Sequence, residues 1–402
     1  MGRRDEDPPI AIVGGGICGL TTALALEQRG FTVDVYEATA EYQPVGAGIL
    51  LQTNALVALE TLGLADEICD AGRSLSDVQI RSPTGQVLQT FDLDAEQNAF
   101  GHRYVAIHRA KLLKILRQNL TSPIHNGKRC TQVSDPHRPT VHFDDGTHID
   151  PGIVIGADGI NSTVRDAITT VSKRSIDTTV FRAVTSVSLP KQHQATGFEV
   201  WGNGTYTGGA PIGDSRFYWF ATAPTELSET ASATDLQASF ADYPEPIPAI
   251  IDALTNDEVI TTGLSDLPAV PRWHCGSTVL AGDAVHGMLP FAGQGAAQSI
   301  EDAVTLAATL DSHTRVTDAF ANYESRRSNR ADRVRAESHR LGRLGTMQSS
   351  LACRLRNTAV SKLPEAVFKR FRHRRVADAS VPPVAQVHTR PHNDRTGGKP
   401  SL

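Results

Sequence analysis

The chain has 402 residues, of which 40% are hydrophobic and 21% are charged, and its formal charge at pH 7 is −5. This composition is too apolar and too balanced for a disordered chain, and the length suffices for about two or three domains with a sizeable core. Five cysteines without a C-x-x-C pair argue against a disulfide scaffold and a zinc site, so we expect a reducing compartment and no bound metal.

Residues 8–26 carry no charge, and this stretch is therefore compared first with a signal peptide and a membrane helix. Asp5, Glu6 and Asp7 interrupt the positive segment that precedes the apolar part of a signal peptide. Four glycines within the stretch would also weaken a spanning helix. We therefore expect a cytoplasmic chain without a membrane span.

The first predicted elements form a strand–helix–strand unit. Ile10–Val13 is a short apolar run, Leu20–Arg29 is predicted as a helix, and Thr32–Tyr36 is predicted as a second strand that ends at Glu37. The turn between the first strand and the helix carries the G-x-G-x-x-G pattern of dinucleotide-binding folds, at Gly14, Gly16 and Gly19.

Each residue of this pattern has a physical role in holding a dinucleotide. Gly14 permits the tight turn, Gly16 lets a pyrophosphate approach the backbone, and Gly19 lets the helix pack close to the strand. The helix N-terminus offers free N–H groups and partial positive charge to the phosphates. Glu37 can accept hydrogen bonds from a ribose diol and would repel a 2′-phosphate, so the site favours FAD or NAD over NADP.

Two later predicted strands also end in turns that contain an aspartate. The apolar run Ile153–Gly156 leads through Asp158 towards a helix that begins near Arg165. The strand Ser277–Ala281 ends at a Gly-Asp pair that contains Asp283. Beyond it, a glycine-rich turn with Gly293 and Gly295 precedes a predicted helix over residues 296–310.

These motifs, in this order, resemble those of the single-component FAD-dependent aromatic hydroxylases, the p-hydroxybenzoate hydroxylase-like flavoprotein monooxygenases. The resemblance covers residues 10–345 and is closest to the salicylate and urate hydroxylase branch. It implies an α/β (α+β) fold in which a Rossmann-like FAD-binding domain is interleaved with a β-sheet substrate domain and followed by helices. It also implies that NADH or NADPH and O2 are used to hydroxylate a small aromatic or heteroaromatic substrate through a flavin C4a-hydroperoxide.

By this resemblance, residues beyond the first glycine motif also hold the FAD. Arg109, at the start of a predicted helix, reaches the cofactor, and Asp283 accepts hydroxyl groups of its ribitol or ribose. Asp158 is associated with the FAD pyrophosphate and with the reductant, and Arg165 is expected to brace Asp158, with contact to the nicotinamide phosphate as the alternative. Gly48 belongs to a glycine-rich stretch that borders the mobile flavin in the family, although an ordinary turn explains it equally well.

The helix that begins after Gly293 and Gly295 has a further role by physical argument. Two-electron reduction leaves a negative charge around N1 of a flavin, and the free N–H groups of a helix N-terminus stabilise such a charge. The backbone N–H groups of Ala296 and Ala297 are the candidate donors, and their small side chains let the ring lie close. Pro290 stands where the family has a proline beside the flavin, with a plain turn proline as the alternative.

The substrate is expected to bind on a second sheet that is rich in β-forming residues. Arg182 is a candidate partner for a substrate carboxylate or enolate, and Tyr218 for a substrate hydroxyl. Each has an equally good structural explanation, because alternation along a strand decides which face a side chain meets. Phe291 is also assigned to the substrate site. Tyr206 stands where the urate branch has an arginine, which argues against urate as the substrate.

We expect two domains that are interleaved in the sequence, followed by helices and a tail. The FAD-binding domain is expected over residues 8–76, 102–170 and 273–345, and the substrate domain over residues 77–101 and 171–272. C-terminal helices are expected over residues 346–380 and a flexible tail over residues 381–402.

Basic residues are concentrated near the C-terminus. Residues 326–375 hold 15 basic and 3 acidic residues, a local charge of +12 that leaves −17 on the rest of the chain. We interpret this run as a solvated helical face. Because it lacks interleaved aromatic residues, it does not indicate a nucleic-acid or membrane partner, and we expect a monomer or homodimer with small-molecule ligands only.

Two alternatives to the hydroxylase remain open. The same fold serves FAD-dependent epoxidases, dehydrogenases and reductases. A non-catalytic FAD-binding redox sensor would bind FAD without substrate-stimulated oxidation of NAD(P)H.

Overall fold

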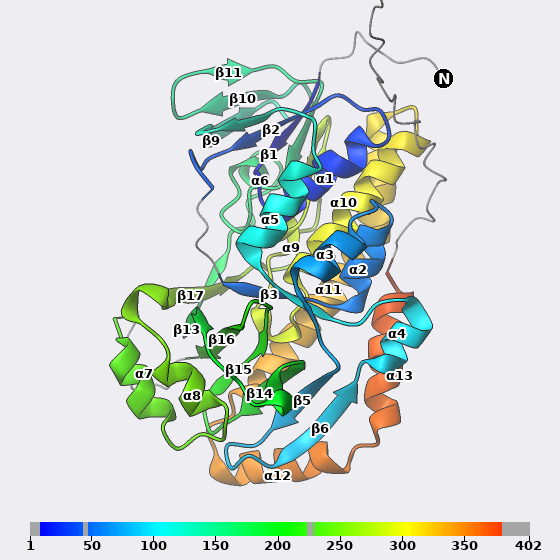
Figure 1. The fold of residues 1–402 in the computed structure, drawn as a ribbon. Helices are drawn as coiled ribbons and strands as arrows, with labels where there is room; N and C mark the ends of the chain where they lie inside the picture. The colour runs from blue at the N-terminus through cyan, green and yellow to red at the C-terminus, as the bar shows by residue number, and fades with distance from the viewer. Residues whose placement is uncertain (1–8, 43–46, 223–226, 228–229, 380–402) are drawn as a thin grey trace, which may run out of the picture.

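A computed structural model describes residues 9–42, 47–222, 227 and 230–379 of the chain. The predicted tail over residues 381–402 and the start of the glycine-rich stretch before Gly48 lie outside the described residues. The molecule has two main sheets, one in the upper and one in the lower half of Figure 1, with a long helix alongside both. None of the helices in the described ranges is both long and apolar enough to cross a membrane.

The upper sheet has six strands, and its neighbouring strands are parallel except where β18 pairs with β19. Its strands in spatial order are β18 (His274–Cys275), β19 (Thr278–Leu280), β12 (Ile153–Gly156), β1 (Ile10–Val13), β2 (Val33–Glu37) and β8 (Ile124–Asn126). β1 lies inside the sheet and is buried along its whole length, as expected for a continuous apolar run in a parallel sheet.

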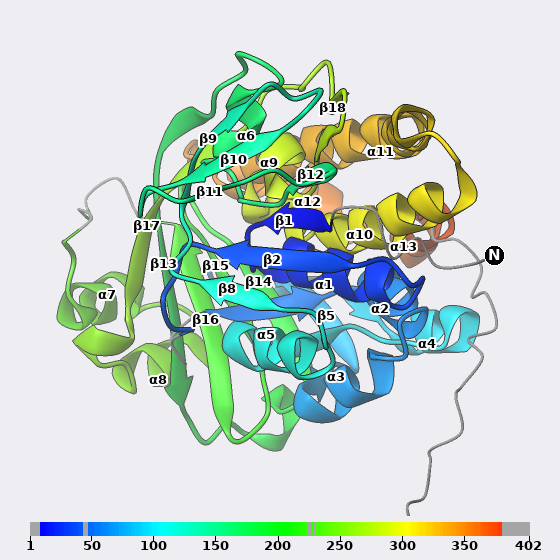
Figure 2. The same ribbon diagram turned by 90° about the horizontal axis from the view of Figure 1, so that it is seen from above.

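Two buried helices pack side by side against this sheet, α1 (Ile17–Glu27) and α10 (Gly295–Ser312) (Figure 2). Smaller helices surround them: α2 (Thr53–Glu60), α3 (Ala65–Ala71), α4 (Asp94–Phe100), α5 (Arg109–Gln118), α6 (Thr163–Asp166), α9 (Asp283–His286) and the 3-10 turn η3 (Pro290–Ala292). Two small sheets complete this half: β9 (Cys130–Ser134), β10 (Thr140–Phe143) and β11 (His148–Ile149), and β3 (Gly48–Leu51), β4 (Arg73–Ser74) and β7 (Val105–His108).

The lower sheet has seven strands drawn from separate parts of the chain. In spatial order they are β17 (Ile260–Asp266), β13 (Arg174–Ser186), β16 (Arg216–Thr222), β15 (Tyr206–Pro211), β14 (Thr196–Trp201), β5 (Asp77–Arg81) and β6 (Val87–Asp92). β5 and β6 come early in the sequence but extend the sheet at β14. The predicted fold class is therefore confirmed, whereas the boundaries of the two domains stay a prediction.

The two faces of the lower sheet have different partners, because side chains alternate along each strand. Phe181, Phe217 and Trp219 lie on one face and pack with α7 (Ala233–Phe240) and α8 (Ile247–Asp252). The opposite face includes Val180 and Tyr206, which pack with η3 of the upper half. The short 3-10 turns η1 (Lys191–His193) and η2 (Asn256–Glu258) contact β14 and β13 of this sheet.

The basic segment forms α11 (Val316–Gly345), α12 (Ser350–Lys362) and α13 (Glu365–Ala377). The interpretation of this run as a solvated face is wrong in part, because four of its arginines are buried: Arg327, Arg330, Arg356 and Arg372. Each meets a carboxylate or backbone carbonyls in the interior. The arginines thus attach the C-terminal helices to the body of the protein.

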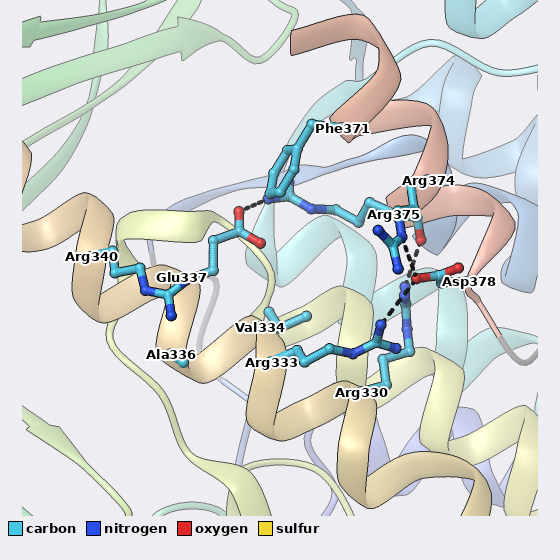
Figure 3. Close-up of a pocket in the computed structure, with 10 residues that line it drawn as sticks. All are labelled: Arg330, Arg333, Val334, Ala336, Glu337, Arg340, Phe371, Arg374, Arg375 and Asp378. Atoms are coloured by element: carbon cyan, nitrogen blue, oxygen red, sulfur yellow. Dashed lines mark hydrogen bonds and ion pairs between the residues drawn. The ribbon is translucent and has the colours of Figure 1, made fainter. Parts of the chain in front are cut away.

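A surface pocket between α11 and α13 is lined in part by Arg330, Arg333, Arg340, Arg374 and Arg375 (Figure 3). Within it, Arg333 and Arg374 both pair with Asp378, and Arg375 pairs with Glu337. These ion pairs hold α13 on α11. Arg375 also donates to Gln52 Oε1 at 2.6 Å, which links α13 to the interior of the upper half.

A buried charge network joins α10 to α11. Arg327 is completely buried; its Nε donates to Asp302 Oδ1 at 2.7 Å, and its Nη1 pairs with Glu301. Arg330 donates to both carboxylate oxygens of Glu301 at 2.6 Å. Burial alone would raise the pKa of Asp302, but the charges of His286 and Arg327 hold it well below its usual value. Both carboxylates are therefore ionised and compensated in the interior.

We predict that Arg327→Met lowers the free energy of unfolding by about 3–5 kcal/mol at neutral pH, because two buried carboxylates lose a cation. Chemical denaturation of the two proteins measures this difference. Arg326→Met is the matched control, since Arg326 is the exposed neighbour in the same helix. The low native pKa of Asp302 stabilises the fold at pH values above its unfolded pKa of about 4, and this contribution is lost as the pH falls towards the lower native pKa, so the deficit of the variant should narrow below about pH 4. An equal loss in both variants would contradict this role.

Candidate active site

The first glycine turn leaves an open space at the N-terminus of α1. Gly14 has φ +109°, and a Cβ there would overlap the carbonyl of Ala157 at the end of β12. A Cβ on Gly19 would overlap the carbonyl of Gly14, so both glycines are required by packing. At Gly16, in contrast, a Cβ would meet nothing within 4 Å, and no side chain caps the helix. The N–H groups of the first turn of α1 therefore face a space that an anion can enter.

Glu37 lies at the end of β2, beside this turn. Its Oε2 accepts a hydrogen bond of 2.7 Å from Gly15 N, and its Oε1 accepts one of 2.8 Å from Thr39 N. Tyr42 donates to the carbonyl of Gly15 at 2.7 Å, which fixes the turn from the other side. The carboxylate is thus held in one orientation with lone pairs left for a ribose diol.

Asp158 closes the same space from the end of β12. Its Oδ2 accepts hydrogen bonds from Thr163 N at 2.8 Å and Val164 N at 3.2 Å, so it caps α6. Its Oδ1 is buried and has no partner among the described residues. Burial raises the pKa of this carboxyl, and the hydrogen bonds that it accepts partly offset this rise. An unsatisfied buried oxygen of this kind is explained by a missing ligand or water.

Arg165 braces the turn that carries Asp158 through the backbone, and its charge also interacts with the Asp158 carboxylate. Its guanidinium donates to three carbonyls, those of Ile160, Val171 and Ala284, at 3.0–3.1 Å. These bonds tie the Asp158 turn to α9, where Asp283 begins the helix. Arg165 therefore holds the two aspartate turns together through three of its N–H groups.

Asp283 lies where several candidate residues meet. The residue is accessible to solvent, but the protein around its carboxyl raises the pKa of that group. The positive charges of His286 and Arg109 partly offset this rise. Its Oδ1 lies 3.9 Å from the position that a Cβ of Gly295 would take. The carboxyl of Asp283 is therefore accessible at the start of α9 and close to the start of α10.

The N-terminus of α10 lies close to Asp283. Gly293 has φ +60°, which a glycine adopts without strain, and no side chain caps the helix. Ala296 and Ala297, the predicted donors, lie in its first turn. The preceding Gln294 is held by Gln52 at 2.7 Å and by Asn54. These amides were not identified in the sequence, where an isolated glutamine in a glycine-rich turn carries no signal.

These residues fit an FAD molecule. Two uncapped helix N-termini, the open face of Gly16 and the unpartnered Oδ1 of Asp158 suit the diphosphate and the flavin. Glu37 and Asp283 suit the hydroxyl groups of ribose and ribitol. Arg109 is exposed at the start of α5, near enough to Asp283 to affect its charge.

Arg182 and Tyr218 lie on the face of the lower sheet that meets the upper half. Arg182 Nη1 donates to Thr262 Oγ1 at 2.6 Å, and the guanidinium also hydrogen-bonds Tyr218. Burial raises the pKa of Tyr218, although the charge of Arg182 partly offsets this rise. The hydroxyl therefore stays protonated at neutral pH. A Cβ on Gly48 would overlap Tyr218, so the absence of a side chain in β3 lets the tyrosine approach.

Tyr206, Phe291 and Pro290 border the same region. The rings of Tyr206 and Phe291 meet edge to face with centroids 5.3 Å apart, and both side chains are buried. Pro290 is exposed at the start of η3, one turn before α10. These residues therefore form a wall between the lower sheet and the expected flavin position, and their direct contact with substrate stays a prediction.

One residue of this face was missed in the sequence. Glu199 lies in β14 between Phe198 and Val200, which point to the opposite face. Its carboxylate accepts hydrogen bonds from Trp201 Nε1 at 3.3 Å and from the Tyr206 hydroxyl. A carboxyl in an otherwise apolar alternating strand was the available signal.

Comparisons with known proteins agree with this geometry. A family model described as FAD binding domain matches residues 7–338. The chain is 33% identical over 353 residues to an aurachin C monooxygenase/isomerase of Stigmatella aurantiaca, covering 86% of this chain and 92% of that protein. It is 31% identical to a 2-heptyl-3-hydroxy-4(1H)-quinolone synthase of Pseudomonas aeruginosa, and the match covers 91% of this chain and 97% of that protein. The crystal structure of Klebsiella pneumoniae HpxO complexed with FAD and uric acid matches the fold with a TM-score of 0.83 at 24% identity, covering 93% and 98%.

We predict that Gly16→Val keeps the stability of the fold but abolishes FAD binding, because the new side chain enters only the open space beside the first turn of α1. Thermal unfolding of the apoprotein and titration with FAD separate the two effects. Unchanged FAD binding would show that the diphosphate does not approach this glycine.

Asp283→Asn should weaken FAD binding at least about tenfold, because hydrogen bonds to a charged acceptor contribute about 1.5–3 kcal/mol. Calorimetric titration of the apoprotein measures this change. Asp311→Asn, at the exposed end of α10, is the control and should bind FAD like the unmodified protein. Equal affinities of all three proteins for FAD would show that Asp283 does not bind the cofactor.

Proposed function

Because the chain belongs to the FAD-binding family whose model it matches, we propose that it hydroxylates a small aromatic or heteroaromatic ring with NADH or NADPH and O2. It is an FAD-dependent monooxygenase, and the proposal concerns its substrate and its reductant. The observation that supports a ring substrate is the face of the lower sheet that carries Arg182, Tyr218 and Phe220, of which Phe220 packs in the same cluster as Phe291 of η3.

When bound, FAD takes up two electrons from a reductant and activates O2 for the transfer of one oxygen atom. The protein must hold that cofactor, orient the ring and exclude water. Glu37, Asp158 and Asp283 bind the polar parts of the dinucleotide, and the N–H groups at the start of α10 stabilise negative charge on the flavin.

Arg182 and Tyr218 orient the ring. Tyr218 donates a hydrogen bond to a substrate oxygen, and Arg182 both fixes the phenol and stabilises negative charge that develops on that oxygen. The apolar rings of Phe220, Tyr206 and Phe291 enclose the site and limit the access of water.

Nitrogen heterocycles with an oxygen substituent are the substrate class that we propose. One relative is named for a 4(1H)-quinolone, and this chain has Tyr206 where the resemblance gives the urate branch an arginine. A cytoplasmic location and a monomeric or homodimeric state remain part of this proposal.

The proposed function is tested with the FAD-loaded protein and a panel of phenols, purines, pyridones and quinolones. We expect one class to stimulate NADH or NADPH oxidation and to gain one atom of ¹⁸O from ¹⁸O2, with hydrogen peroxide counted separately. Stimulated oxidation of NADH or NADPH without a labelled product would favour a dehydrogenase or reductase. A labelled epoxide as product would favour an epoxidase. FAD binding without any stimulation would favour the redox sensor.

Tyr218→Phe should lower the fraction of oxidised NAD(P)H that yields product and raise the fraction that yields hydrogen peroxide, because the ring is less well oriented. Product and peroxide are measured in the same reactions. Tyr243→Phe is the control, since it removes a hydroxyl that bonds Thr205 beside the cluster on the opposite sheet face. Identical partitioning in both variants would remove Tyr218 from the substrate site.

A further inference from the structure

One row of paired residues crosses the substrate face of the lower sheet. Arg182 of β13 pairs with Phe220 of β16, Phe220 pairs with Gly208 of β15, and Gly208 pairs with Glu199 of β14. Directly paired residues point to the same face, and Figure 1 shows these strands side by side. The row thus has a cation at one end, a carboxyl at the other, and an aromatic ring and a glycine between them.

Gly208 leaves one position of this row without a side chain. A Cβ there would overlap the carbonyl oxygen of Phe198, so no side chain stands between Phe220 and Glu199. Neighbouring strands are about 4.8 Å apart, which puts the backbones of Arg182 and Glu199 about 14 Å apart across three spacings. A flat ring placed over Gly208 would have the face or edge of Phe220 on one side and the Glu199 carboxyl on the other.

The surroundings of Glu199 leave acceptor capacity unused. Its two donors are neutral, the indole of Trp201 and the phenol of Tyr206. None of its recorded interactions within the described ranges involves a cation. Burial raises the pKa of its carboxyl, and the two hydrogen bonds partly offset this rise. The residue is only partly buried, so part of it stays accessible. A carboxyl in such a place gains from a further donor.

The position of Glu199 connects it to the expected flavin. The Tyr206 ring, whose hydroxyl bonds Glu199, packs on Phe291 of η3, the turn that leads into α10. The carboxyl is therefore one side chain away from the segment that borders the cofactor. It is on the substrate side of that segment, because it belongs to the same sheet face as Tyr218.

We propose that Glu199 is the residue that selects the substrate, by accepting a hydrogen bond from an N–H or O–H group on the ring. Arg182 and Tyr218 bind an oxygen acceptor at the opposite edge. This inference rests on the proposed function and sharpens it: the substrate is a heteroaromatic lactam or aminophenol with a donor and an acceptor on opposite edges. A ring that presents a carboxylate towards β14 is rejected, because it meets Glu199 with like charge.

The competing explanation is that Glu199 only accepts the hydrogen bonds of Trp201 and Tyr206 and so keeps the wall of the cavity in place. A structural role of this kind would affect every ligand equally. A recognition role affects only ligands that carry the donor, and this difference is measurable.

The test measures the binding of two matched pairs of probes to the FAD-loaded protein. Binding is monitored by calorimetry and by changes in the flavin absorption spectrum. The pairs are 4(1H)-pyridone with N-methyl-4-pyridone, and 4(1H)-quinolone with N-methyl-4-quinolone. We expect the N–H compound of at least one pair to bind about tenfold or more tightly than its N-methyl partner, as for one hydrogen bond to a charged acceptor. Binding of neither pair, or equal binding within both, would overturn the proposal.

Glu199→Gln should abolish most of this preference by weakening the N–H compound and leaving the N-methyl compound unchanged. Glu365→Gln, at an exposed site in α13, should retain the full preference. If Glu199→Gln does not fold, Glu199→Asp serves instead, and we expect a reduced preference because its carboxylate is withdrawn by one methylene. An equal loss for both members of a pair, or no loss, would overturn the proposal. Because these readouts need no turnover, a failure to incorporate oxygen would count against the proposed function alone.

Discussion

The paired charge of Asp302 inside the protein holds together the segments that build the cofactor site. Its Oδ2 accepts hydrogen bonds from Gly282 N at 2.8 Å and from His286 Nε2 at 2.6 Å, while its Oδ1 accepts one from Arg327. A buried carboxylate is costly unless it is fully paired, so these three partners are constrained relative to one another. The turn before Asp283, the middle of α10 and the middle of α11 are thereby fixed in one arrangement.

The same long helix also joins the cofactor half to the substrate half. Near its C-terminal end, a Cβ on Gly342 would lie 2.6 Å from the Phe291 ring, and a Cβ on Gly345 would lie 2.9 Å from the Tyr206 ring. The two glycines therefore let α11 pack closely on the aromatic wall between the sheets. α11 thus fixes α10 through ion pairs, and it fixes Tyr206 and Phe291 through close packing. This arrangement sets the position of the substrate ring relative to the flavin.

The local parts of the site could be predicted from the sequence, because turn chemistry is written in neighbouring residues. Gly19 is required by its contact with the carbonyl of Gly14 in the same turn, and α5 begins at Arg109 as predicted. Partners far apart in the sequence could not be predicted. Arg327 belongs to a basic run that resembles a solvated face, and only the packing of α10 on α11 places it beside Glu301. Glu199 is likewise assigned to the substrate face only by the register of β14 with β15.

The most direct measurement is a crystal structure of the protein with FAD and a bound ring substrate. The account predicts the adenosine at Glu37, the diphosphate at the N-terminus of α1, and the flavin between Asp283 and the start of α10. It predicts the substrate ring over Gly208, with its donor on Glu199 and its acceptor towards Arg182 and Tyr218. An FAD molecule bound elsewhere, or a ring that leaves the row from Arg182 to Glu199 uncontacted, would contradict it.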